Sequence, residues 1–550
     1  MANIKIPRKQ FEKDIGKLDE KMQNKIALFG TTLEQFDEKE IELDIFPNRP
    51  DLLSYQGFKR SFLSFLGKKP GLKIYKLHKP EKNYKINIDS SVKEIRPFTA
   101  CAIVKGLTLD DEKIKELIDI QEKLHTTIGR KRKKLAIGIY PLEKIKLPIT
   151  YKAMEPDKIR FIPLESTREM SGLEILQKHP TGKEYSSLLA GKVKFPVFVD
   201  AAKNILSMPP IINSQLTGRI TTETKEVFVE CSGHNFEILK KCLNIIITTM
   251  AEMGGNIYQM ELNYPKKEIT PNLIPEKEKI SLAHANKMLG LDLKEKQLKT
   301  LFGKMGCNYS SSKVEVPAWR TDILHEVDLI EDLAIAYGYE NFKPEIPKIS
   351  TIAQEDAKEP IKRKIAEILI GLGMLEVSNY HLTNKKDQFL KMGIGEKQIK
   401  EFIEVEASKT EYNTLREDLS HYLLKILSEN IDAEYPQEIF EIGKVFKYKQ
   451  EIVEKERLAV AMSPRNFTEI KQVLEYLSKM TNTKLEIKEP QKLPTHFIEG
   501  RAGSITLENK EIGFIGEIHP RILKNWKIKM PVALFELNLE QIYEKILSSY

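Results

Sequence analysis

Cysteine is scarce in this sequence, with four residues in 550, at positions 101, 231, 242 and 307. No two of them have the spacing of a zinc site, and their wide separation is not that of a disulfide framework. The sequence therefore excludes a cysteine-based zinc site and a disulfide-stapled scaffold. It indicates a reducing compartment.

Long apolar runs are also missing. The longest, near Ile245 to Ile247, is far shorter than the roughly 20 residues that a membrane-spanning helix needs. The N-terminal segment has no apolar core of a signal peptide, and neither a Walker loop nor a dinucleotide-binding fingerprint is found. We therefore expect a soluble, cytoplasmic protein without a membrane partner.

What is present is typical of a large globular protein. A chain of 550 residues with 41% hydrophobic content favours several domains over one core. Lysine plus arginine exceed aspartate plus glutamate by 87 to 79, and this net charge of +8 is compatible with RNA binding but does not establish it. Helical and strand patterns alternate along the chain, which predicts a multidomain α+β protein.

The most distinctive stretch runs from Val314 to Tyr339, where a strand ends at Pro317 and an acidic helix follows. Helix positions three and four apart share a face, and like charges there repel. A magnesium ion could offset this repulsion, although magnesium usually takes only one or two protein carboxylates and keeps several waters. The alternative is a solvated acidic helix start, favoured by the helix dipole. The candidate metal ligands are Asp322, Asp328, Glu331 and Asp332.

Two strings in this stretch carry a family resemblance: Val314-Glu-Val-Pro-Ala-Trp-Arg-Thr-Asp-Ile323 and Asp328-Leu-Ile-Glu-Asp-Leu-Ala-Ile-Ala-Tyr-Gly-Tyr339. They resemble the small domain of the phenylalanyl-tRNA synthetase beta subunit. The resemblance implies a small helical domain over residues 270–345. It also implies that the four acidic residues hold a Mg²⁺ ion.

The N-terminal domain is expected over residues 1–85. Its string from Pro47 to Ser54, Pro-Asn-Arg-Pro-Asp-Leu-Leu-Ser, is again similar to the beta-subunit family. Asn48, Arg49 and Asp51 could form a functional loop, but the position of Asp51 favours an N-cap of a helix from about Asp51 to Leu66. The lysine-rich residues 71–90 indicate a linker.

A second domain is expected over residues 90–265. Hydroxyls, amides and glycines gather between Ile205 and Thr224 at predicted loop ends, where they suit recognition of a small polar ligand, although a plain polar loop cluster is the alternative. The basic run from Gly129 to Lys134 could grip phosphate. Such runs are more commonly solvated loop tips.

The resemblance says more about this domain. The strings Ile128-Gly-Arg-Lys-Arg-Lys-Lys-Leu-Ala-Ile-Gly-Ile-Tyr140, Ser207-Met-Pro-Pro-Ile-Ile-Asn-Ser214 and Phe228-Val-Glu-Cys-Ser-Gly233 are similar to the archaeal and eukaryotic-cytosolic branch of the family. There the domain is an editing-type α/β module that hydrolyses tyrosine wrongly attached to tRNA. The resemblance implies an editing pocket that contains Asn213 and Ser214, and further Thr217, Thr221 and Thr222.

Physical chemistry explains why an editing site is needed, although the sequence departs from the family's expected motif at one place. A pocket for phenylalanine cannot strongly reject an isostere that merely adds a hydroxyl, whereas a second site that binds the hydroxyl can select it. The departure is His234-Asn235, where the branch is expected to have Thr-Asp. It motivates the alternative of a non-enzymatic scaffold and tRNA-binding subunit with a degenerate editing pocket.

The last domain is expected over residues 355–550, after a linker from Pro344 to about Glu359. Its antiparallel strands and flanking helices resemble the family's class II synthetase-like domain. A glycine-rich segment with a following arginine, which would stack on adenine, is missing near its end. The domain is therefore expected to be non-catalytic, no catalytic residue is assigned, and Arg416 and His519 are interpreted as structural.

The resemblance covers nearly the whole chain in order. It implies a beta subunit in an assembly of two alpha and two beta chains, which charges tRNA(Phe) with phenylalanine using ATP and magnesium. The alpha subunit would carry the aminoacylation site, and this chain would edit Tyr-tRNA(Phe). A free-standing magnesium enzyme that transfers phosphoryl groups is the remaining alternative.

Overall fold

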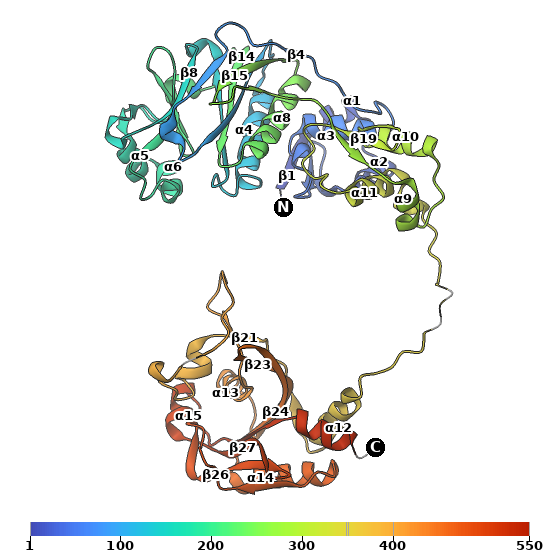
Figure 1. Cartoon of the computed structure of the whole chain (residues 1–550), viewed down its shortest axis with the longest axis vertical. Helices are drawn as coiled ribbons and strands as arrows, with labels where there is room; N and C mark the ends of the chain where they lie inside the picture. The colour runs from blue at the N-terminus through green and yellow to red at the C-terminus, as the bar shows by residue number, and fades with distance from the viewer. Residues whose placement is uncertain (1, 348, 350, 400, 549–550) are drawn as a thin grey trace. The chain divides into compact units, whose positions relative to one another are not determined.

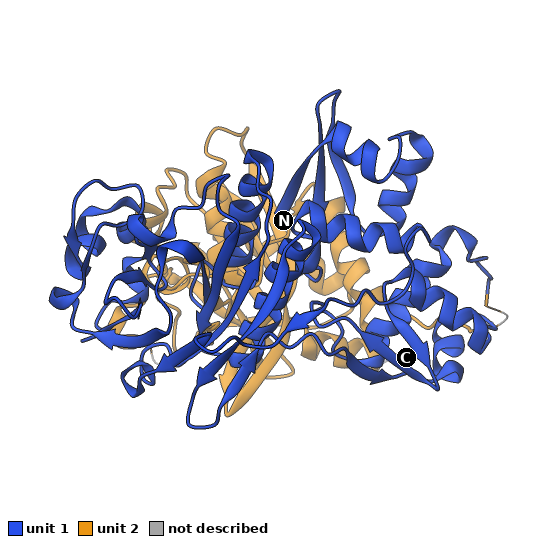
Figure 2. Cartoon of the chain, turned by 90° about the horizontal axis from the view of Figure 1, so that it is seen from above, with its two compact units in different colours: residues 1–346 blue, residues 347–550 orange. Residues whose placement is uncertain are grey.

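The computed structural model describes residues 2–347, 349, 351–399 and 401–548. The chain forms two compact units, residues 1–346 and 347–550 (Figure 2). The boundary falls inside the predicted linker after Pro344. Within the described ranges, every helix falls short of the length and apolar content that a membrane span requires.

The N-terminal region of the first unit is a small antiparallel sheet, in the order β1-β3-β2, with three helices (Figure 1). Its elements are β1 (Ala2–Pro7), α1 (Arg8–Asp14), α2 (Glu20–Leu28), β2 (Thr32–Phe36), β3 (Glu40–Ile45), the 3₁₀ turn η1 (Pro50–Leu52) and α3 (Tyr55–Phe65). The predicted N-cap at Asp51 is wrong. Both Asp51 carboxylate oxygens accept hydrogen bonds from Arg49 at 2.9 Å, so the side chain of Ser54 caps α3 instead, by accepting from the Gly57 amide at 3.0 Å.

The N-terminal region shares its core with segments far along the chain. Phe58 and Phe62 of α3 belong to the same buried cluster as Trp319. The Arg60 guanidinium lies 4.2 Å from the centre of the Trp319 ring, and Ser64 Oγ donates to the carbonyl of Gly303 at 2.8 Å. These contacts join residues 55–65 to residues 303–319 as one packed body.

The largest sheet of the first unit has 11 strands, with the main path β13-β12-β11-β8-β5-β15-β6-β14-β7. Its strands are β4 (Leu77–His78), β5 (Lys85–Ile88), β6 (Phe98–Lys105), β7 (Leu135–Pro141), β8 (Ile149–Met154), β11 (Phe195–Val199), β12 (Ile205–Met208), β13 (Ile212–Asn213), β14 (Glu226–Gly233), β15 (Asn256–Asn263) and β16 (Glu268–Thr270). The prediction of a linker over residues 71–90 is wrong, because β4 and β5 pair with β15. Single buried positions such as Ile86 anchor these strands despite the polar composition around them.

Two long helices, α4 (Asp111–Thr126) and α8 (Phe236–Glu252), lie against β6, β14 and β7 (Figure 1). Helix α8 contributes buried apolar side chains on several faces, because it packs against α3 as well as the sheet. The smaller elements are η2 (Ser90–Val92), η3 (Leu142–Lys144), η4 (Pro156–Lys158), β9 (Arg160–Phe161), β10 (Met170–Ser171), α5 (Gly172–Lys178), α6 (Pro180–Tyr185), η5 (Ser186–Leu188) and α7 (Gln215–Gly218).

The first unit ends in a three-stranded sheet, β17-β19-β18, with three helices. Its elements are β17 (Glu276–Lys279), α9 (Leu282–Leu289), α10 (Glu295–Lys304), β18 (Asn308–Ser310), β19 (Lys313–Val316), α11 (Glu326–Tyr337) and η6 (Tyr339–Asn341). The predicted cap is confirmed, since Ser281 accepts from the His284 amide at 3.2 Å. Gly290, at φ +65°, ends α9 as predicted.

The second unit has a seven-stranded sheet in the order β20-β23-β24-β28-β27-β26-β25, antiparallel except for the β20–β23 pair. Its elements are α12 (Lys358–Gly371), β20 (Leu375–Glu376), β21 (Leu382–Thr383), the π-helix η7 (Lys386–Leu390), η8 (Glu396–Gln398), β22 (Thr414–Leu415), α13 (Ser420–Glu429), β23 (Gln437–Lys449), β24 (Glu451–Ser463), α14 (Phe467–Met480), β25 (Leu485–Lys488), β26 (Phe497–Leu507), β27 (Lys510–Ile518), α15 (Pro520–Trp526), β28 (Ala533–Asn538) and α16 (Glu540–Leu547). The predicted mixed, multidomain character of the chain is confirmed. The finer assignment of each domain to a synthetase type stays a prediction.

Candidate functional site

A cavity of about 580 Å³ lies in the part of the first unit where the sequence predicts a polar binding site. Its walls come from α4, from β7, from residues 209–220 and from β14. Its polar lining residues are Gln121, Glu122, His125, Arg132, Glu165, Thr181, Asn213, Gln215, Arg219 and Glu230. Residues Ala136, Ile137 and Ile139 of β7 complete the wall, with the Ile137 and Ile139 side chains buried in the core of the first unit. A cavity of this size that combines apolar walls with several polar groups can hold a small ligand.

The local fold creates room for a buried polar pair beside this cavity. Strands β7 and β14 are antiparallel neighbours, and Gly138 lies directly opposite Glu230. A Cβ atom at position 138 would lie 2.2 Å from the Tyr140 hydroxyl oxygen and 2.7 Å from Glu230 Oε1. Glycine at this position therefore allows the side chains of Tyr140 and Glu230 to meet.

Glu230 is the most perturbed group of the cavity. It is only 2% exposed, and its Oε2 has no hydrogen-bond partner among the described residues. Burial raises the pKa of Glu230 to about 8, and the nearby Arg96 opposes this shift only in part. Glu230 is therefore mainly a neutral carboxylic acid at pH 7, and it can donate a hydrogen bond as well as accept one.

The Tyr140 hydroxyl connects Glu230 to the rest of the wall. It donates to Ser207 Oγ at 2.8 Å and lies 3.3 Å from both Asn213 Oδ1 and Glu230 Oε1. A protonated Glu230 can donate to the Tyr140 oxygen. This network holds the position of Glu230 Oε1, whereas Oε2 is buried without a hydrogen-bond partner among the described residues.

His125 is a wall residue whose ring nitrogens are both engaged. The Ile137 amide donates to its Nε2 at 2.8 Å, and its Nδ1 lies 3.2 Å from Glu122 Oε1. Burial lowers the pKa of His125, so the ring is neutral at pH 7 and its Nδ1–H donates to Glu122. With both nitrogens occupied, His125 is not free to act as a general base.

Arg132 closes another side of the cavity. Its guanidinium donates to Glu122 Oε1 and to the Ile211 carbonyl, both at 2.8 Å. It also lies 4.5 Å from the centre of the Tyr185 ring, a cation–π distance. These contacts join α4, α6 and the segment after β12 around the cavity.

The five predicted pocket residues are distributed unequally. Asn213 lines the cavity. Ser214 is buried and its Oγ caps α7 by accepting from the Leu216 amide at 3.3 Å, while buried Thr217 donates to the Leu206 carbonyl at 3.4 Å. Thr221 and Thr222 are exposed and do not line the cavity. The structure therefore gathers Asn213 with Glu230, Tyr140 and His125, which the sequence argument did not select.

The unusual pair His234-Asn235 lies at the start of α8 and not in the cavity lining. The Asn235 side chain caps α8 by accepting from the Ile238 amide at 3.1 Å. Asparagine and aspartate are equally good N-caps. Asparagine in place of the expected aspartate therefore keeps the helix cap and removes nothing from the cavity.

The predicted metal ligands are not arranged around one centre. Arg320 donates to both oxygens of Asp322, at 2.7 and 2.6 Å, and lies 3.1 Å from Asp332. Burial would raise the pKa of Asp322, but the adjacent Arg320 lowers it below its usual value. Burial raises the pKa of Asp332 in spite of Arg320. A guanidinium therefore occupies the place where a cation would neutralise these two carboxylates.

The other two predicted ligands form no contact with Arg320 among the described residues. Asp328 Oδ2 accepts from the amides of Leu324 and His325, at 2.7 and 2.8 Å, and so stabilises the start of α11. Glu331 is exposed. In the part of the chain that the structure describes, no group of three or more His, Cys, Asp or Glu residues is arranged to hold a metal ion. As they stand, the four residues do not fit one shared magnesium site.

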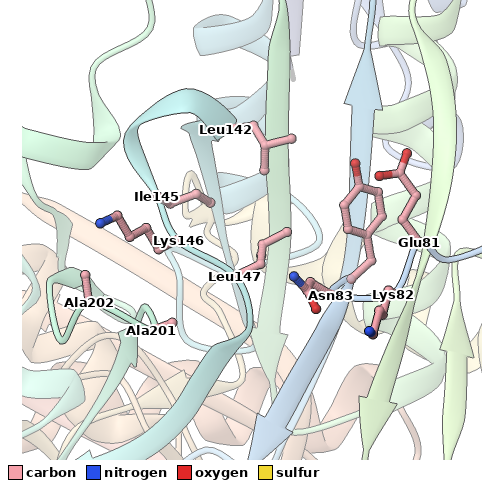
Figure 3. A pocket seen from close by; sticks show the side chains of 10 residues that line it. Glu81, Lys82, Asn83, Leu142, Ile145, Lys146, Leu147, Ala201 and Ala202 are labelled. Carbon is pink, nitrogen blue, oxygen red and sulfur yellow. The ribbon is translucent and has the colours of Figure 1, made fainter.

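A second cavity, of about 610 Å³, lies elsewhere in the first unit (Figure 3). Leu142, Ile145 and Leu147 line one side, and residues 81–84 line the other (Figure 3). None of the predicted site residues lines it. Its described lining contains no buried side-chain atom without a hydrogen-bond partner, so it offers no group comparable to Glu230.

In the second unit, Arg416 is a structural residue. It is 2% exposed, donates to Glu441 Oε1 at 2.6 Å and to the Lys444 carbonyl at 2.7 Å. These partners leave its guanidinium buried in an ion pair. His519 caps α15, since its ring accepts from the Arg521 amide at 3.1 Å, which supports its interpretation as a structural residue.

Two protein-family models match the chain. One, described as the tRNA synthetase B5 domain, matches residues 279–339. The other, described as the phenylalanyl tRNA synthetase beta chain CLM domain, matches residues 343–539. The first match contains the acidic helix, and the second contains nearly all of the second unit.

Whole-chain relatives come from archaea. The phenylalanine–tRNA ligase beta subunits of Thermococcus sibiricus and Pyrococcus furiosus are each 40% identical over 508 residues, which is 90% of both chains in each case. That of Archaeoglobus fulgidus is 36% identical over 545 residues, 97% of both chains. A crystal structure of an N-terminal fragment of the phenylalanyl-tRNA synthetase beta subunit from Pyrococcus horikoshii matches with a TM-score of 0.58 and 37% identity. That match covers 61% of this chain and 99% of the fragment.

Proposed function

The chain belongs to the family of phenylalanine–tRNA ligase beta subunits, and we propose that it acts with an alpha subunit to attach phenylalanine to tRNA(Phe) using ATP. The assembly would contain two alpha and two beta chains and work in the cytoplasm. Aminoacylation would take place on the alpha subunit. This division is supported by Arg416, whose guanidinium is buried against Glu441 and is not free to bind a phosphate.

The reaction proposed for this chain itself is the hydrolysis of Tyr-tRNA(Phe) in the cavity beside β14. The observation that carries this proposal is the buried, neutral Glu230, which lines the cavity and whose Oε2 has no hydrogen-bond partner among the described residues. The hydroxyl of a tyrosyl group can supply that missing hydrogen bond. A phenylalanyl group in the same position would leave Oε2 unsatisfied.

The expected selectivity follows from this difference. Sites built to bind a hydroxyl can reject the analogue that lacks it by large factors, because the buried polar groups stay unpaired. Apolar lining residues on the Glu230 face of the sheet, such as Ala136, would pack against the ring common to both amino acids. Selection would therefore depend on the hydroxyl alone. The cavity would accept tyrosine and reject phenylalanine, which is the reverse of the preference of a phenylalanine pocket.

Water is the proposed nucleophile. The described lining of the cavity contains neither serine nor cysteine, and both nitrogens of His125 are engaged. The step would break the ester bond between the tyrosyl carbonyl carbon and the ribose oxygen. Water adds its hydroxyl to the carbonyl carbon, and the ribose oxygen takes up the proton.

The test is deacylation of Tyr-tRNA(Phe) and Phe-tRNA(Phe) by the wild type and by Glu230→Ala. A buried polar group left without its hydrogen-bond partner costs about 1–3 kcal/mol, so the ratio of kcat/KM for the two substrates should fall roughly 5- to 160-fold. Glu226→Ala, on the same strand but outside the cavity, is the matched control. An unchanged ratio in Glu230→Ala would overturn the role of Glu230. A wild type that hydrolyses neither ester would overturn editing.

A second candidate function is that of a scaffold and tRNA-binding subunit without editing activity. The pair His234-Asn235 motivates it, but the cap formed by Asn235 accounts for that pair without loss of a cavity group. The two functions differ in one assay, because a scaffold would not accelerate deacylation of Tyr-tRNA(Phe). The cavity and Glu230 favour editing.

The partnership is tested by co-expression with the alpha chain from the same genome. We expect phenylalanine charging of tRNA(Phe) only in the co-purified pair, at a mass of two plus two chains. Charging by this chain alone, or failure to form a complex, would contradict the proposal. ATP binding by this chain alone would favour a free-standing magnesium enzyme, for which the described residues give no supporting arrangement.

Magnesium binding stays a prediction. With Asp322 and Asp332 held by Arg320, a Mg²⁺ ion could use at most Asp328 and Glu331 directly without rearrangement, with waters completing its shell. Metal content of the purified wild type and of Asp328→Asn would test this. Stoichiometric magnesium that Asp328→Asn loses would support the prediction, and its absence from the wild type would contradict it.

A further inference from the structure

The basic run noted in the sequence forms a tight turn between α4 and β7. Arg130, Lys131 and Arg132 all have left-handed backbone conformations, with φ of 47°, 54° and 62°. Such conformations are unfavourable for residues other than glycine and persist only where the surrounding structure enforces them. Here the Arg132 amide donates to the His125 carbonyl at 3.0 Å, and the Lys134 amide donates to the Gly129 carbonyl at 2.8 Å.

The five cations of this turn differ in their partners. Arg132 is engaged by Glu122, by the Ile211 carbonyl and by the Tyr185 ring. The other four are exposed, and none forms an ion pair with a described carboxylate. These four, which we call the free basic set, are Arg130, Lys131, Lys133 and Lys134. An ordered turn thus presents four unneutralised positive charges.

The turn adjoins the proposed editing cavity. Arg132 in its middle lines the cavity, and so do Ala136 and Ile137, which follow it directly. Arg219, from the segment after α7, is an exposed lining residue that likewise has no ion pair among the described carboxylates. Uncompensated positive charge therefore lies beside the cavity.

The chemistry of the proposed substrate matches this arrangement. If the tyrosyl hydroxyl reaches Glu230, the ester and terminal ribose lie toward the opening, and the preceding phosphates of the RNA strand lie outside. Lysine and arginine bind phosphate oxygens through charge-assisted hydrogen bonds, and release of counterions makes such binding salt-dependent.

We propose that the free basic set binds the phosphodiesters of the 3′-terminal nucleotides of the aminoacylated RNA and so positions its ester over the cavity. The inference rests on the proposed editing function, because that function supplies the RNA. Binding of the phosphates is assigned to Arg130, Lys131, Lys133 and Lys134, whereas Arg132 is a structural part of the cavity wall.

The test compares two charge-removing variants of the full chain. Lys131→Gln/Lys133→Gln removes two charges from the free basic set. Lys203→Gln/Lys266→Gln is the matched control, because both lysines are exposed, neither lines the cavity, and Lys203 is left-handed like Lys131, at φ 70°. Each protein is assayed on Tyr-tRNA(Phe) and on 3′-O-tyrosyl-adenosine, an ester without phosphate, over a range of salt concentrations.

We expect Lys131→Gln/Lys133→Gln to raise KM for Tyr-tRNA(Phe) several-fold at low salt, with kcat nearly unchanged. The slope of log KM against log salt should fall by about 1.4, since each single-strand phosphate contact contributes about 0.7. For the nucleoside ester KM should change less than twofold, and the control variant should match the wild type on both substrates.

Two outcomes would overturn the inference. One is an unchanged KM and salt slope for Tyr-tRNA(Phe) in Lys131→Gln/Lys133→Gln. The other is an equal KM increase for both esters, which would indicate a distorted cavity. If the wild type hydrolyses neither ester, the proposed editing function is wrong, but the proposed phosphate binding is still tested by a second assay. This assay measures binding of a single-stranded RNA with the tRNA 3′-terminal sequence to the three proteins. Weaker, less salt-dependent binding by Lys131→Gln/Lys133→Gln alone would support the inference, and equal binding by all three proteins would overturn it.

Discussion

Replacement of Glu230 by glutamine should change how the stability of the first unit depends on pH. The folded protein holds the pKa of Glu230 at about 8, against an ordinary value of 4.5. Between these two values the folded state keeps a proton that the unfolded state releases. The stabilisation due to this proton is fully present below pH 4.5 and is lost as the pH rises through 8. Glutamine is neutral throughout and has nearly the same shape.

The magnitude follows from the proton count. Where one extra proton is bound in the folded state, stability falls by about 1.36 kcal/mol for each pH unit. From pH 5.5 to 7.5 the wild type should therefore lose about 2.7 kcal/mol relative to Glu230→Gln. The substitution itself can also change the free energy of unfolding by an amount that does not depend on pH. The prediction therefore concerns only how the difference in unfolding free energy between the two proteins changes with pH.

Hydrogen exchange of the backbone amides in β7 and β14, read by mass spectrometry, measures the local opening free energy at each pH. Comparison of the two proteins at the same pH cancels the intrinsic pH dependence of exchange. Glu226→Gln, from the partly exposed start of β14, should follow the wild type at every pH. Parallel curves for wild type and Glu230→Gln between pH 5.5 and 7.5 would refute the raised pKa of Glu230, and with it the neutral carboxyl proposed to bind the tyrosine hydroxyl.

Three further predictions concern single contacts. Gly138→Ala should lower the free energy of unfolding by about 1–3 kcal/mol and reduce the rate of Tyr-tRNA(Phe) deacylation. The reason is that the new methyl group would lie 2.7 Å from Glu230 Oε1. A normal deacylation rate would show that contact between Tyr140 and Glu230 is not needed for the reaction. Arg320→Ala should lower the free energy of unfolding by about 3–5 kcal/mol, because Asp322 and Asp332 would lose the guanidinium that contacts them and keep only the electrostatic effect of Arg49. Arg320→Lys should restore little, because lysine cannot bind both oxygens of Asp322 in the same way. Unchanged thermal stability in Arg320→Ala would indicate that Arg49 or another cation neutralises the two carboxylates. Asn235→Ala should lower the free energy of unfolding by about 1 kcal/mol, and Asn235→Asp should leave it almost unchanged, because aspartate caps the helix equally well. A gain of deacylation activity in Asn235→Asp would instead support the alternative of a degenerate editing pocket.

The sequence was most informative where local chemistry decides the structure. Ser281 and Gly290 bound α9 as predicted, since an N-cap side chain and a left-handed glycine act within one turn of their own helix. The error at Asp51 is of the opposite kind. Its carboxylate suits an N-cap, but Arg49, two residues earlier, binds both oxygens, and Ser54 caps α3 instead.

The cavity shows where such local reasoning ends. Polar composition selected a segment in which Asn213 lines a cavity, but it could not tell a lining side chain from one that caps a helix, as Ser214 does. Glu230 was missed because a single carboxylate in an apolar strand has no local signature. Its pairing with Tyr140 depends on the register of β14 against β7, which places Gly138 opposite it. A glycine in an apolar strand pattern was the one available signal, since it often marks close approach of another group.

The contacts that join α3 to Trp319 and Gly303 also have a consequence for biosynthesis. Arg60 and Ser64 reach their final contacts only when Trp319 and Gly303, about 250 residues later in the chain, are available. At synthesis rates of about 5–20 residues per second, that delay is roughly 13–50 seconds. The face of α3 that contacts Trp319 and Gly303 stays uncovered on the ribosome during this interval. A chain interrupted before residue 303 would therefore expose it, and we expect nascent chains of intermediate length to depend on chaperones more than the finished protein does.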